Sequence, residues 1–278
     1  MTGALLQGRS LVKDFPLGQG RTVRAVYGVC LDLAPGQRLA VVGESGSGKS
    51  TLLNLLLGLE KPTGGSVTFA GRDVRAGTDL SWLRRRIQYV PQHPSTSFNP
   101  TMRIIDAVAE PLACLGVRGD HRSRAMECLD QVSIGPDLAH RRPGELSGGQ
   151  RQRAAIARAL AVNPEVVLAD EAVSDLDPTI RLAVLTTLVE TCARHGVALV
   201  LVTHDLGVAA YACDSVLVLQ HGRAVDTGTV RDVFTNPSSA ATRHLVDAVA
   251  HLTRRRAPPA TPSCAVTSSA RIEHEENT

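Results

Sequence analysis

The chain has 278 residues, of which 43% are hydrophobic and 21% charged. This is the composition of a globular protein, and it argues against a disordered, collagen-like or membrane-embedded chain. The 30 basic and 27 acidic residues leave a formal net charge of +3, which is too close to neutrality to predict a nucleic-acid partner. No CxxC pair occurs, so neither a disulfide scaffold nor a zinc site is expected at the six scattered cysteines: Cys30, Cys114, Cys128, Cys192, Cys213 and Cys264.

The apolar pattern changes along the chain. Short apolar runs between glycine and proline turns fill residues 1–69 and predict a strand-rich beginning, in which Leu39–Val42 has the continuous apolar run of a strand buried on both faces. Helical spacing replaces it over residues 93–145. From Gly149 onward helices alternate with apolar strands, which favours βα units around a parallel sheet. Residues 253–278 are rich in proline, serine and threonine and predict a disordered tail.

No segment has the features of a membrane span or a secretory leader. The apolar runs have the length of core elements and stay below the roughly 18 residues that a span requires. The N-terminus lacks a charged segment followed by an apolar one. We therefore expect a cytoplasmic chain, and any membrane at which it works to be crossed by another subunit.

A glycine-rich segment follows the first buried strand. Residues 43–50, GESGSGKS, match the pattern G-x-x-x-x-G-K-[ST] and precede a helical run. Glycines let backbone N–H groups surround phosphate oxygens, the lysine reaches the terminal phosphates, and the serine hydroxyl can ligate Mg²⁺. The alternative is a glycine-rich turn without a ligand. The residues expected to contact a nucleotide are Gly43, Ser45, Gly46, Gly48, Lys49, Ser50 and Thr51.

A second apolar strand, Val166–Ala169, ends in two acidic residues. Because the ligand crevice of a parallel sheet lies at the carboxyl ends of its strands, Asp170 and Ser50 are predicted to approach one Mg²⁺ ion. Glu171 is then expected to orient or deprotonate a water that attacks the terminal phosphate. Taken alone, the two acids also fit an ordinary strand-end turn, and it is the phosphate loop that favours the metal site.

A third segment, Leu146–Gln150, places a serine and two glycines before the helical run at residues 151–160. Ser147 is a natural N-cap, and Gly148 and Gly149 expose backbone N–H groups at the positive end of a helix. An ordinary capped helix is the alternative. The chain nevertheless has two predicted anion-binding helix starts, and one phosphate cannot obviously occupy both within a monomer.

These three segments, in this order and spacing, resemble the ATP-binding cassette (ABC) ATPases. The resemblance implies an α/β P-loop fold, with a RecA-like core around a parallel sheet, an antiparallel β region and an inserted helical subdomain. It implies head-to-tail pairing, in which ATP and Mg²⁺ lie between the phosphate loop of one cassette and Ser147, Gly148, Gly149 and Gln150 of the other. The implied divisions are core at 1–92 and 146–252, helical subdomain at 93–145 and tail at 253–278.

Three further catalytic or interface assignments carry over from the resemblance. Gln92 matches the glutamine that contacts Mg²⁺ and the attacking water, and His204 matches the histidine that contacts the γ-phosphate. Residues 174–177 match a loop that crosses the dimer interface, within which Asp177 also fits an N-cap before a proline at the first helical position.

An aromatic ring is expected to stack on the adenine, and Phe15 is preferred over Tyr27 for this role. The sequence departs from the family pattern without losing a catalytic group, so an active ATPase is predicted. The departing residues are His93, Ala172 and Asp175.

Residues Ser97–Pro100 and Phe234–Pro237 resemble the oligopeptide, dipeptide and nickel importer branch of the family. That branch implies two integral-membrane permease subunits, an extracytoplasmic solute-binding protein and a peripheral position on the cytoplasmic side of the membrane. A second ABC ATPase would complete a homodimer or heterodimer, and no nucleic acid is involved. The cargo would be a peptide, nickel or a metal chelate, with residues 170–177 slightly favouring nickel. The alternatives are an accessory ATPase of a soluble complex such as the phosphonate-degradation machinery, and a nucleotide-gated binding module with little turnover.

Overall fold

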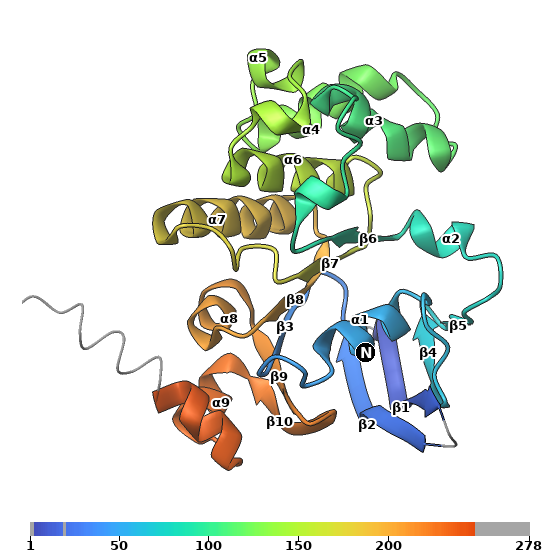
Figure 1. Cartoon of the computed structure of the whole chain (residues 1–278), viewed down its shortest axis with the longest axis vertical. Coiled ribbons are helices and arrows are strands. Elements are labelled where there is room, and N and C mark those ends of the chain that lie inside the picture. Colours follow the sequence, from blue (N-terminus) through green and yellow to red (C-terminus); the bar gives the residue numbers. More distant parts are fainter. Residues whose placement is uncertain (1–2, 19–20, 248–278) are drawn as a thin grey trace, which may run out of the picture.

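The computed structural model describes residues 3–18 and 21–247, so the tail predicted at 253–278 lies outside the described residues. Two sheets form the frame of this part of the chain, with strand orders β10-β9-β3-β8-β7-β6 and β2-β1-β4-β5. In Figure 1 helices α3–α6 gather at the top, above the six-stranded sheet, and the four-stranded sheet lies to its lower right, beside α1. The strands are β1 (Leu6–Gly18), β2 (Arg21–Leu33), β3 (Arg38–Val42), β4 (Gly64–Phe69), β5 (Arg72–Asp73), β6 (Ile87–Val90), β7 (Val166–Asp170), β8 (Ala198–Thr203), β9 (Ser215–Gln220) and β10 (Arg223–Thr229).

The helices alternate with these strands in the second half of the chain, as the sequence predicts. Two short 3₁₀ turns, at Pro94–Thr96 and Pro143–Glu145, lie on either side of the segment that holds α3, α4 and α5. The α-helices are α1 (Lys49–Leu56), α2 (Ser81–Arg84), α3 (Ile104–Cys114), α4 (His121–Gln131), α5 (Pro136–Ala139), α6 (Gly148–Leu160), α7 (Pro178–Arg194), α8 (Leu206–Ala212) and α9 (Val230–Thr235).

Strand β3 lies inside the larger sheet and is buried on both faces. It pairs in parallel with β8 and with β9. Leu39 and Val41 pack on the side of α1 and the four-stranded sheet, whereas Ala40 and Val42 pack on the side of α6 and α7. Successive side chains of a strand point to opposite faces, so a continuous apolar run is what two buried faces require. The prediction for Leu39–Val42 is confirmed.

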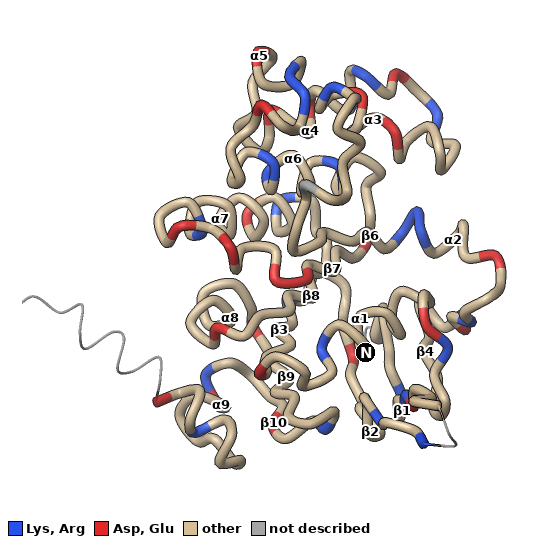
Figure 2. The backbone as a smooth tube through the Cα atoms, viewed as in Figure 1, with Lys and Arg blue, Asp and Glu red and all other residues tan. Residues whose placement is uncertain are grey.

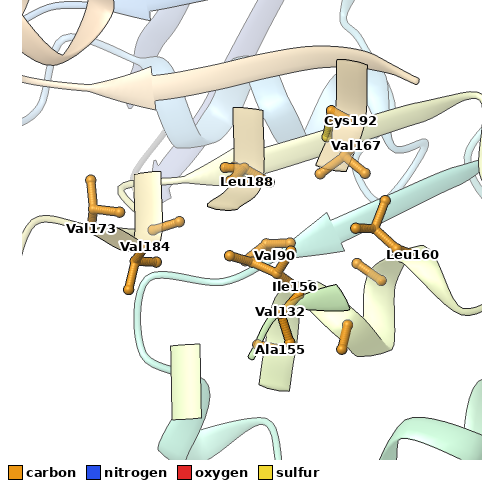
Figure 3. Close-up of a cluster of buried hydrophobic side chains, with 14 of the residues drawn as sticks. Val90, Val132, Ala155, Ile156, Leu160, Val167, Val173, Val184, Leu188 and Cys192 are labelled. Carbon is orange, nitrogen blue, oxygen red and sulfur yellow. The ribbon is translucent and has the colours of Figure 1, made fainter. Parts of the chain in front are cut away.

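A single apolar cluster joins the sheet to the helices above it. Side chains of β6, β7, α6 and α7 meet there, among them Val90, Val167, Ile156 and Leu188, as Figure 3 shows. Helices α3 and α4 continue the same cluster through residues such as Val108. Helices α3 and α4 therefore pack on α6, and α5 packs on α3 and α4. All three fall within residues 93–145, and the division of the chain at those residues stays a prediction.

Figure 2 shows charged residues of both signs scattered over the molecule, whereas β8, β9 and α8 carry none. Within residues 3–18 and 21–247, no helix combines the length and the apolar character needed to cross a bilayer.

A buried carboxylate fixes the chain after α9. Asp226, on β10, accepts hydrogen bonds from the backbone N–H of Ser239, from the hydroxyl and N–H of Ser238, and from the hydroxyl of Thr242. Burial opposes ionisation of Asp226, but these hydrogen bonds outweigh it and lower its pKa to about 2. The ionised carboxylate thus ties the helical segment at residues 240–247 to the edge strand.

We predict that Asp226→Asn destabilises the protein at neutral pH. A pKa near 2 in the folded state, below its ordinary value of 3.8, gives stability that is present above pH 3.8 and lost as the pH falls through 2. The variant is expected to lose about 2 kcal/mol at pH 7. Urea unfolding at several pH values measures the loss. The difference in free energy of unfolding between the variant and the unsubstituted protein should shrink towards pH 2. Asp130→Asn, at an exposed position of α4, is the control; a gap that does not change with pH would contradict the assignment.

Candidate functional site

Four parallel strands of the larger sheet end at one edge, and the expected site residues follow them. The strands β3, β8, β7 and β6 are neighbours in the sheet and run in one direction. The segments that begin at Gly43, His204, Glu171 and Pro91 therefore leave the sheet on the same side. A crevice outside the carboxyl ends of parallel strands is where such sheets bind ligands.

The loop between β3 and α1 has a backbone that only glycine allows. Gly46 and Gly48 have φ values of +79° and +102°, and Gly48 is the N-cap of α1. A Cβ on Gly48 would lie 2.6 Å from the carbonyl oxygen of Ala25, and a Cβ on Gly43 would lie 2.3 Å from that of Leu219. Ser47 Oγ is buried in this loop with no hydrogen-bond partner among the described residues. An orphaned polar atom in a tight glycine loop fits a phosphate cradle.

Lys49 begins α1 and points back across the loop. Its side chain is 5% exposed, and Nζ donates to the carbonyl oxygens of Gly43 at 2.8 Å and Glu44 at 2.9 Å. Burial lowers the pKa of Lys49, and the carboxylates of Glu171 and Asp170 act in the opposite direction. The ammonium group is thus held at the inner face of the loop, beside the acidic end of β7.

Asp170 ends β7 next to the start of α1. Burial raises the pKa of the Asp170 carboxyl, and a hydrogen bond with Ser50 opposes that rise. The hydroxyl of Tyr89, on β6, lies 3.4 Å from Asp170 Oδ2. The pKa of Tyr89 is raised to about 12 by burial and by the charge of Asp170. Ser50 and Asp170 therefore lie near each other, with Tyr89 as an additional partner of Asp170, and their sharing of one Mg²⁺ ion stays a prediction.

Glu171 is the point at which the segments meet. Its Oε1 lies 3.8 Å from Nζ of Lys49, and its Oε2 lies 3.4 Å from Nδ1 of His204 and 3.4 Å from Nε2 of Gln92. Its backbone has a φ of +43°, in the left-handed region that a glutamate rarely adopts. Side chains that follow three other strands, β3, β8 and β6, are thus brought within hydrogen-bond or ion-pair range of one carboxylate.

The segment that carries Gln92 is braced on α6 at both ends. Nε2 of Gln152 donates to the carbonyl oxygen of Pro91 at 3.3 Å. The guanidinium of Arg158 donates to the carbonyl oxygen of Ser97 at 2.7 Å and to its hydroxyl at 2.9 Å. Burial lowers the pKa of Arg158. Since α6 begins at Ser147, one helix links the signature segment rigidly to the loop of Gln92.

Ser147 caps α6 with a reciprocal pair of hydrogen bonds. The N–H of Gln150 donates to Ser147 Oγ at 3.3 Å, and the N–H of Ser147 donates to Gln150 Oε1 at 2.9 Å. Gly148 is exposed, whereas Gly149 packs against Ile180 of α7. No hydrogen bond or ion pair of the described residues joins residues 146–150 to residues 43–51. The expected second anion site is a capped, accessible helix start that is separate from the phosphate loop of its own chain.

The loop at residues 174–177 touches both Gln92 and α7. Ser174 Oγ accepts from Nε2 of Gln92 at 3.2 Å, and the guanidinium of Arg181 donates to the carbonyl oxygens of Ser174 at 3.0 Å and Leu176 at 3.3 Å. Asp177 is the N-cap of α7, but its side chain makes no cap hydrogen bond. Asp177 therefore occupies the predicted N-cap position, but its side chain does not cap the helix. Its carboxylate is exposed at the surface.

The two aromatic candidates for the adenine lie on the four-stranded sheet. Phe15, on β1, is half-buried, and the ammonium of Lys13 lies 4.8 Å from its ring centre. Tyr27, on β2, is flanked by the guanidinium groups of Arg24 at 5.5 Å and Arg223 at 4.4 Å. Neither ring is joined to the phosphate loop by a contact that decides between them, and the choice of Phe15 stays a prediction.

Several residues that hold the site had not been identified from the sequence. Tyr89 on Asp170, Gln152 on Pro91 and Arg181 on the loop at 174–177 act across strands and helices. No local pattern marks them, because the partner of each is defined only when the elements pack.

A glycine-rich loop after the central strand β3, an acidic end on β7, one strand further along the sheet beyond β8, and a separate serine-capped helix define an ATP-binding cassette fold. The chain belongs to the ABC transporter family, whose model matches residues 26–174.

Comparison with known proteins agrees with this fold. The chain is 42% identical over 255 residues to the glutathione import ATP-binding protein GsiA of Escherichia coli strain K12, over 88% of this chain and 41% of GsiA. GsiA of Pectobacterium atrosepticum is 40% identical over the same shares. The chain spans about two fifths of the length of the curated relatives it matches.

Solved cassettes have the same architecture. A dimeric post-hydrolysis state of the cassette MJ0796 bound to ADP and Pi has a TM-score of 0.72 and 31% identity, covering 81% of this chain and 99% of that one. CbiO1 from Clostridium perfringens, part of the ABC transporter complex cbiONQ, has a TM-score of 0.75 and 26% identity, covering 91% and 99%. The predicted family and fold class are thus confirmed.

We predict that Gly48→Ala destabilises the phosphate loop. The new Cβ would lie 2.6 Å from the Ala25 carbonyl oxygen at a residue whose φ is +102°, so strain and steric overlap combine. Urea unfolding is expected to show a loss of about 1–3 kcal/mol. Gly144→Ala is the matched control, because a Cβ there meets nothing within 4 Å. Equal losses in the two variants would rule out the crowding argument.

Proposed function

We propose that this chain is the ATP-binding and ATP-hydrolysing subunit of an ABC importer whose membrane permeases are separate proteins. The observation that carries the proposal is the convergence of Lys49, Gln92 and His204 on the Glu171 carboxylate. Two supports come from relatives: MJ0796 binds ADP and Pi, and GsiA is named for glutathione import.

The phosphate loop would hold the triphosphate of ATP. Residues 43–48 lead into the positive N-terminal end of α1, and the Lys49 ammonium supplies a buried positive charge. Ser45 and Gly46 are exposed at the tip of the loop, and Thr51 lies in the first turn of α1. Phe15 would stack on the adenine with its half-buried ring.

The donor set beside the loop fits Mg²⁺. The Ser50 hydroxyl lies near the Asp170 carboxylate, and the amide oxygen of Gln92 belongs to the loop after β6. Mg²⁺ prefers oxygen ligands and commonly takes one or two carboxylates together with substrate phosphates. When bound, the ion would neutralise phosphate charge, while Asp170, Ser50 and Gln92 hold it.

Glu171 would act as the general base of hydrolysis. Its carboxylate accepts a proton from a water whose oxygen attacks the γ-phosphorus, the bond to the β-phosphate oxygen breaks, and ADP and inorganic phosphate leave. Gln92 would orient that water through its contact with Glu171 at 3.4 Å. Lys49 and His204 would stabilise the negative charge on the phosphoryl oxygens.

A second cassette would complete the site. The signature residues Ser147–Gln150 form an accessible, capped helix start, separate from the phosphate loop of the same chain. A head-to-tail pair would bring this helix start onto the nucleotide of the partner, with Asp177 in the loop between the cassettes. Relatives such as MJ0796 are dimeric. The second cassette would be a copy of this chain or a related ATPase.

ATP binding would close the cassettes, and the loop of Gln92 would pass the change to two integral-membrane permeases at the cytoplasmic face of the membrane. An extracytoplasmic solute-binding protein would select the cargo. A peptide, nickel or a metal chelate is the proposed cargo, and the name of GsiA supports a small peptide. Stable association with soluble enzymes, rather than with a multi-span membrane protein, would favour the phosphonate-degradation type of complex instead. Affinity purification from detergent-solubilised membranes separates the two.

We predict that Glu171→Gln abolishes turnover but retains ATP. The amide keeps the shape of the side chain and cannot accept the proton, so kcat should fall at least about 100-fold. Phosphate release measures turnover, and equilibrium binding of a fluorescent ATP analogue measures affinity. Lys49→Ala is the contrasting variant, because loss of the buried ammonium should abolish binding itself. Unchanged nucleotide affinity in Lys49→Ala would overturn the phosphate assignment, and equally low turnover in the unsubstituted protein would favour a nucleotide-gated binding module.

We predict that Asp170→Asn raises the Mg²⁺ requirement. Replacing a ligating carboxylate by an amide removes charge from the site, so the Mg²⁺ concentration for half-maximal ATPase activity should rise at least about tenfold. A Mg²⁺ titration of phosphate release at fixed ATP measures the shift. Tyr89→Phe, which removes only the contact of the tyrosine hydroxyl with Asp170, should raise the required Mg²⁺ concentration less. An unchanged Mg²⁺ dependence in Asp170→Asn would exclude this carboxylate as a ligand.

A further inference from the structure

Two of the residues that depart from the family pattern contact each other. His93 follows Gln92, and Asp175 lies in the loop at residues 174–177. Nδ1 of His93 lies 3.0 Å from Oδ2 of Asp175. An Nδ1–H group donates a hydrogen bond from the neutral ring as well as from the charged one, so the contact does not require a charged histidine.

The contact runs beside a second one between the same two loops. Nε2 of Gln92 donates to Ser174 Oγ at 3.2 Å, and the Ser174 hydroxyl also lies 2.9 Å from the carbonyl oxygen of Glu171. Ser174 Oγ is 3.4 Å from Oδ1 of Asp175. Consecutive residues of one loop thus bind consecutive residues of the other, which fixes both the position and the direction of the Gln92 side chain.

Neither His93 nor Asp175 touches Glu171, whereas Gln92 does, at 3.4 Å. The side chains of His93 and Asp175 are 61% and 55% exposed. An exposed pair of this kind contributes little to overall stability. Its effect is therefore expected on local geometry. The segment from Pro91 is braced on α6 at Pro91 and Ser97, and between those points its other described side-chain tie to the loop at 174–177 is the hydrogen bond from Gln92 to Ser174.

We propose that the His93–Asp175 hydrogen bond is a positioning pair that keeps Gln92 aligned with Glu171 and so raises kcat. The inference rests on the proposed ATPase role of Gln92 and Glu171. It gives His93 and Asp175 a function in the loop that links hydrolysis to the permease contact. Neither residue is a catalytic residue, since both act through Gln92.

The test is a double-mutant cycle on the full chain with steady-state ATPase kinetics. His93→Leu and Asp175→Ala should each lower kcat about two- to fivefold, the range that one exposed polar pair supports, while KM for ATP stays unchanged. The double variant should be no worse than either single variant. His93→Asn should restore most of kcat, because the asparagine amide places an N–H donor near the position of Nδ1.

A matched substitution and a separate readout keep the outcomes distinct. His140→Leu, at another exposed histidine, should leave kcat unchanged. Additive losses in the cycle, or no rescue by His93→Asn, would overturn the positioning pair. A loss in Asp175→Ala alone, accompanied by weaker ATP-dependent dimerisation, would assign Asp175 to the interface instead. Gln92→Ala reports on the proposed function by itself: normal kcat in that variant would reject the role of Gln92, whatever the cycle shows.

Discussion

The buried ammonium of Lys49 organises the site. A lysine taken out of water costs several kcal/mol unless its charge is matched and its N–H groups are satisfied. Here two loop carbonyls accept from Nζ, and the acidic end of β7 lies beside it. Matching the charge and satisfying the N–H groups requires two things of the fold. The loop must close around the lysine, and β7, which Glu171 follows, must lie next to β8 and near β3. A triphosphate brings further negative charge to the same ammonium.

Strain is concentrated at the same place. Glu171 adopts a φ of +43°, and the phosphate loop depends on two glycines with positive φ. Backbone conformations of this kind cost of order 1–3 kcal/mol for a residue other than glycine and persist where the surrounding structure enforces them. The turn after β7 is enforced by backbone hydrogen bonds, from the Glu171 N–H to the Val202 carbonyl and from the Ser174 N–H to the Glu171 carbonyl. The result is a carboxylate aimed at Lys49, Gln92 and His204 together.

Helix α6 connects the signature segment to the loop of Gln92. Its first turn is the capped signature segment, and its buried Gln152 and half-buried Arg158 hold the two ends of the Gln92 loop. Its apolar face packs into the cluster shared with α3, α4, β6 and α7. A displacement of the helical segment therefore carries the signature turn and the Gln92 loop with it, because the apolar packing and the hydrogen bonds are on one rigid element. This is the physical basis on which a nucleotide-driven movement could reach another subunit.

Local sequence determined the features of this protein that depend only on residues close together in the chain. The glycine pattern at 43–50, the apolar strand ending in Asp170 and the Ser147 cap each follow from propensity, periodicity and side-chain type, and the structure has all three where they were expected. Tertiary packing decided which of them meet. Glu171 contacts Lys49, Gln92 and His204, and His93 contacts Asp175, only because parallel strands bring distant loops to one edge of the sheet. Such contacts have no periodicity in the chain, since they depend on the register between strands and on the helix that braces them.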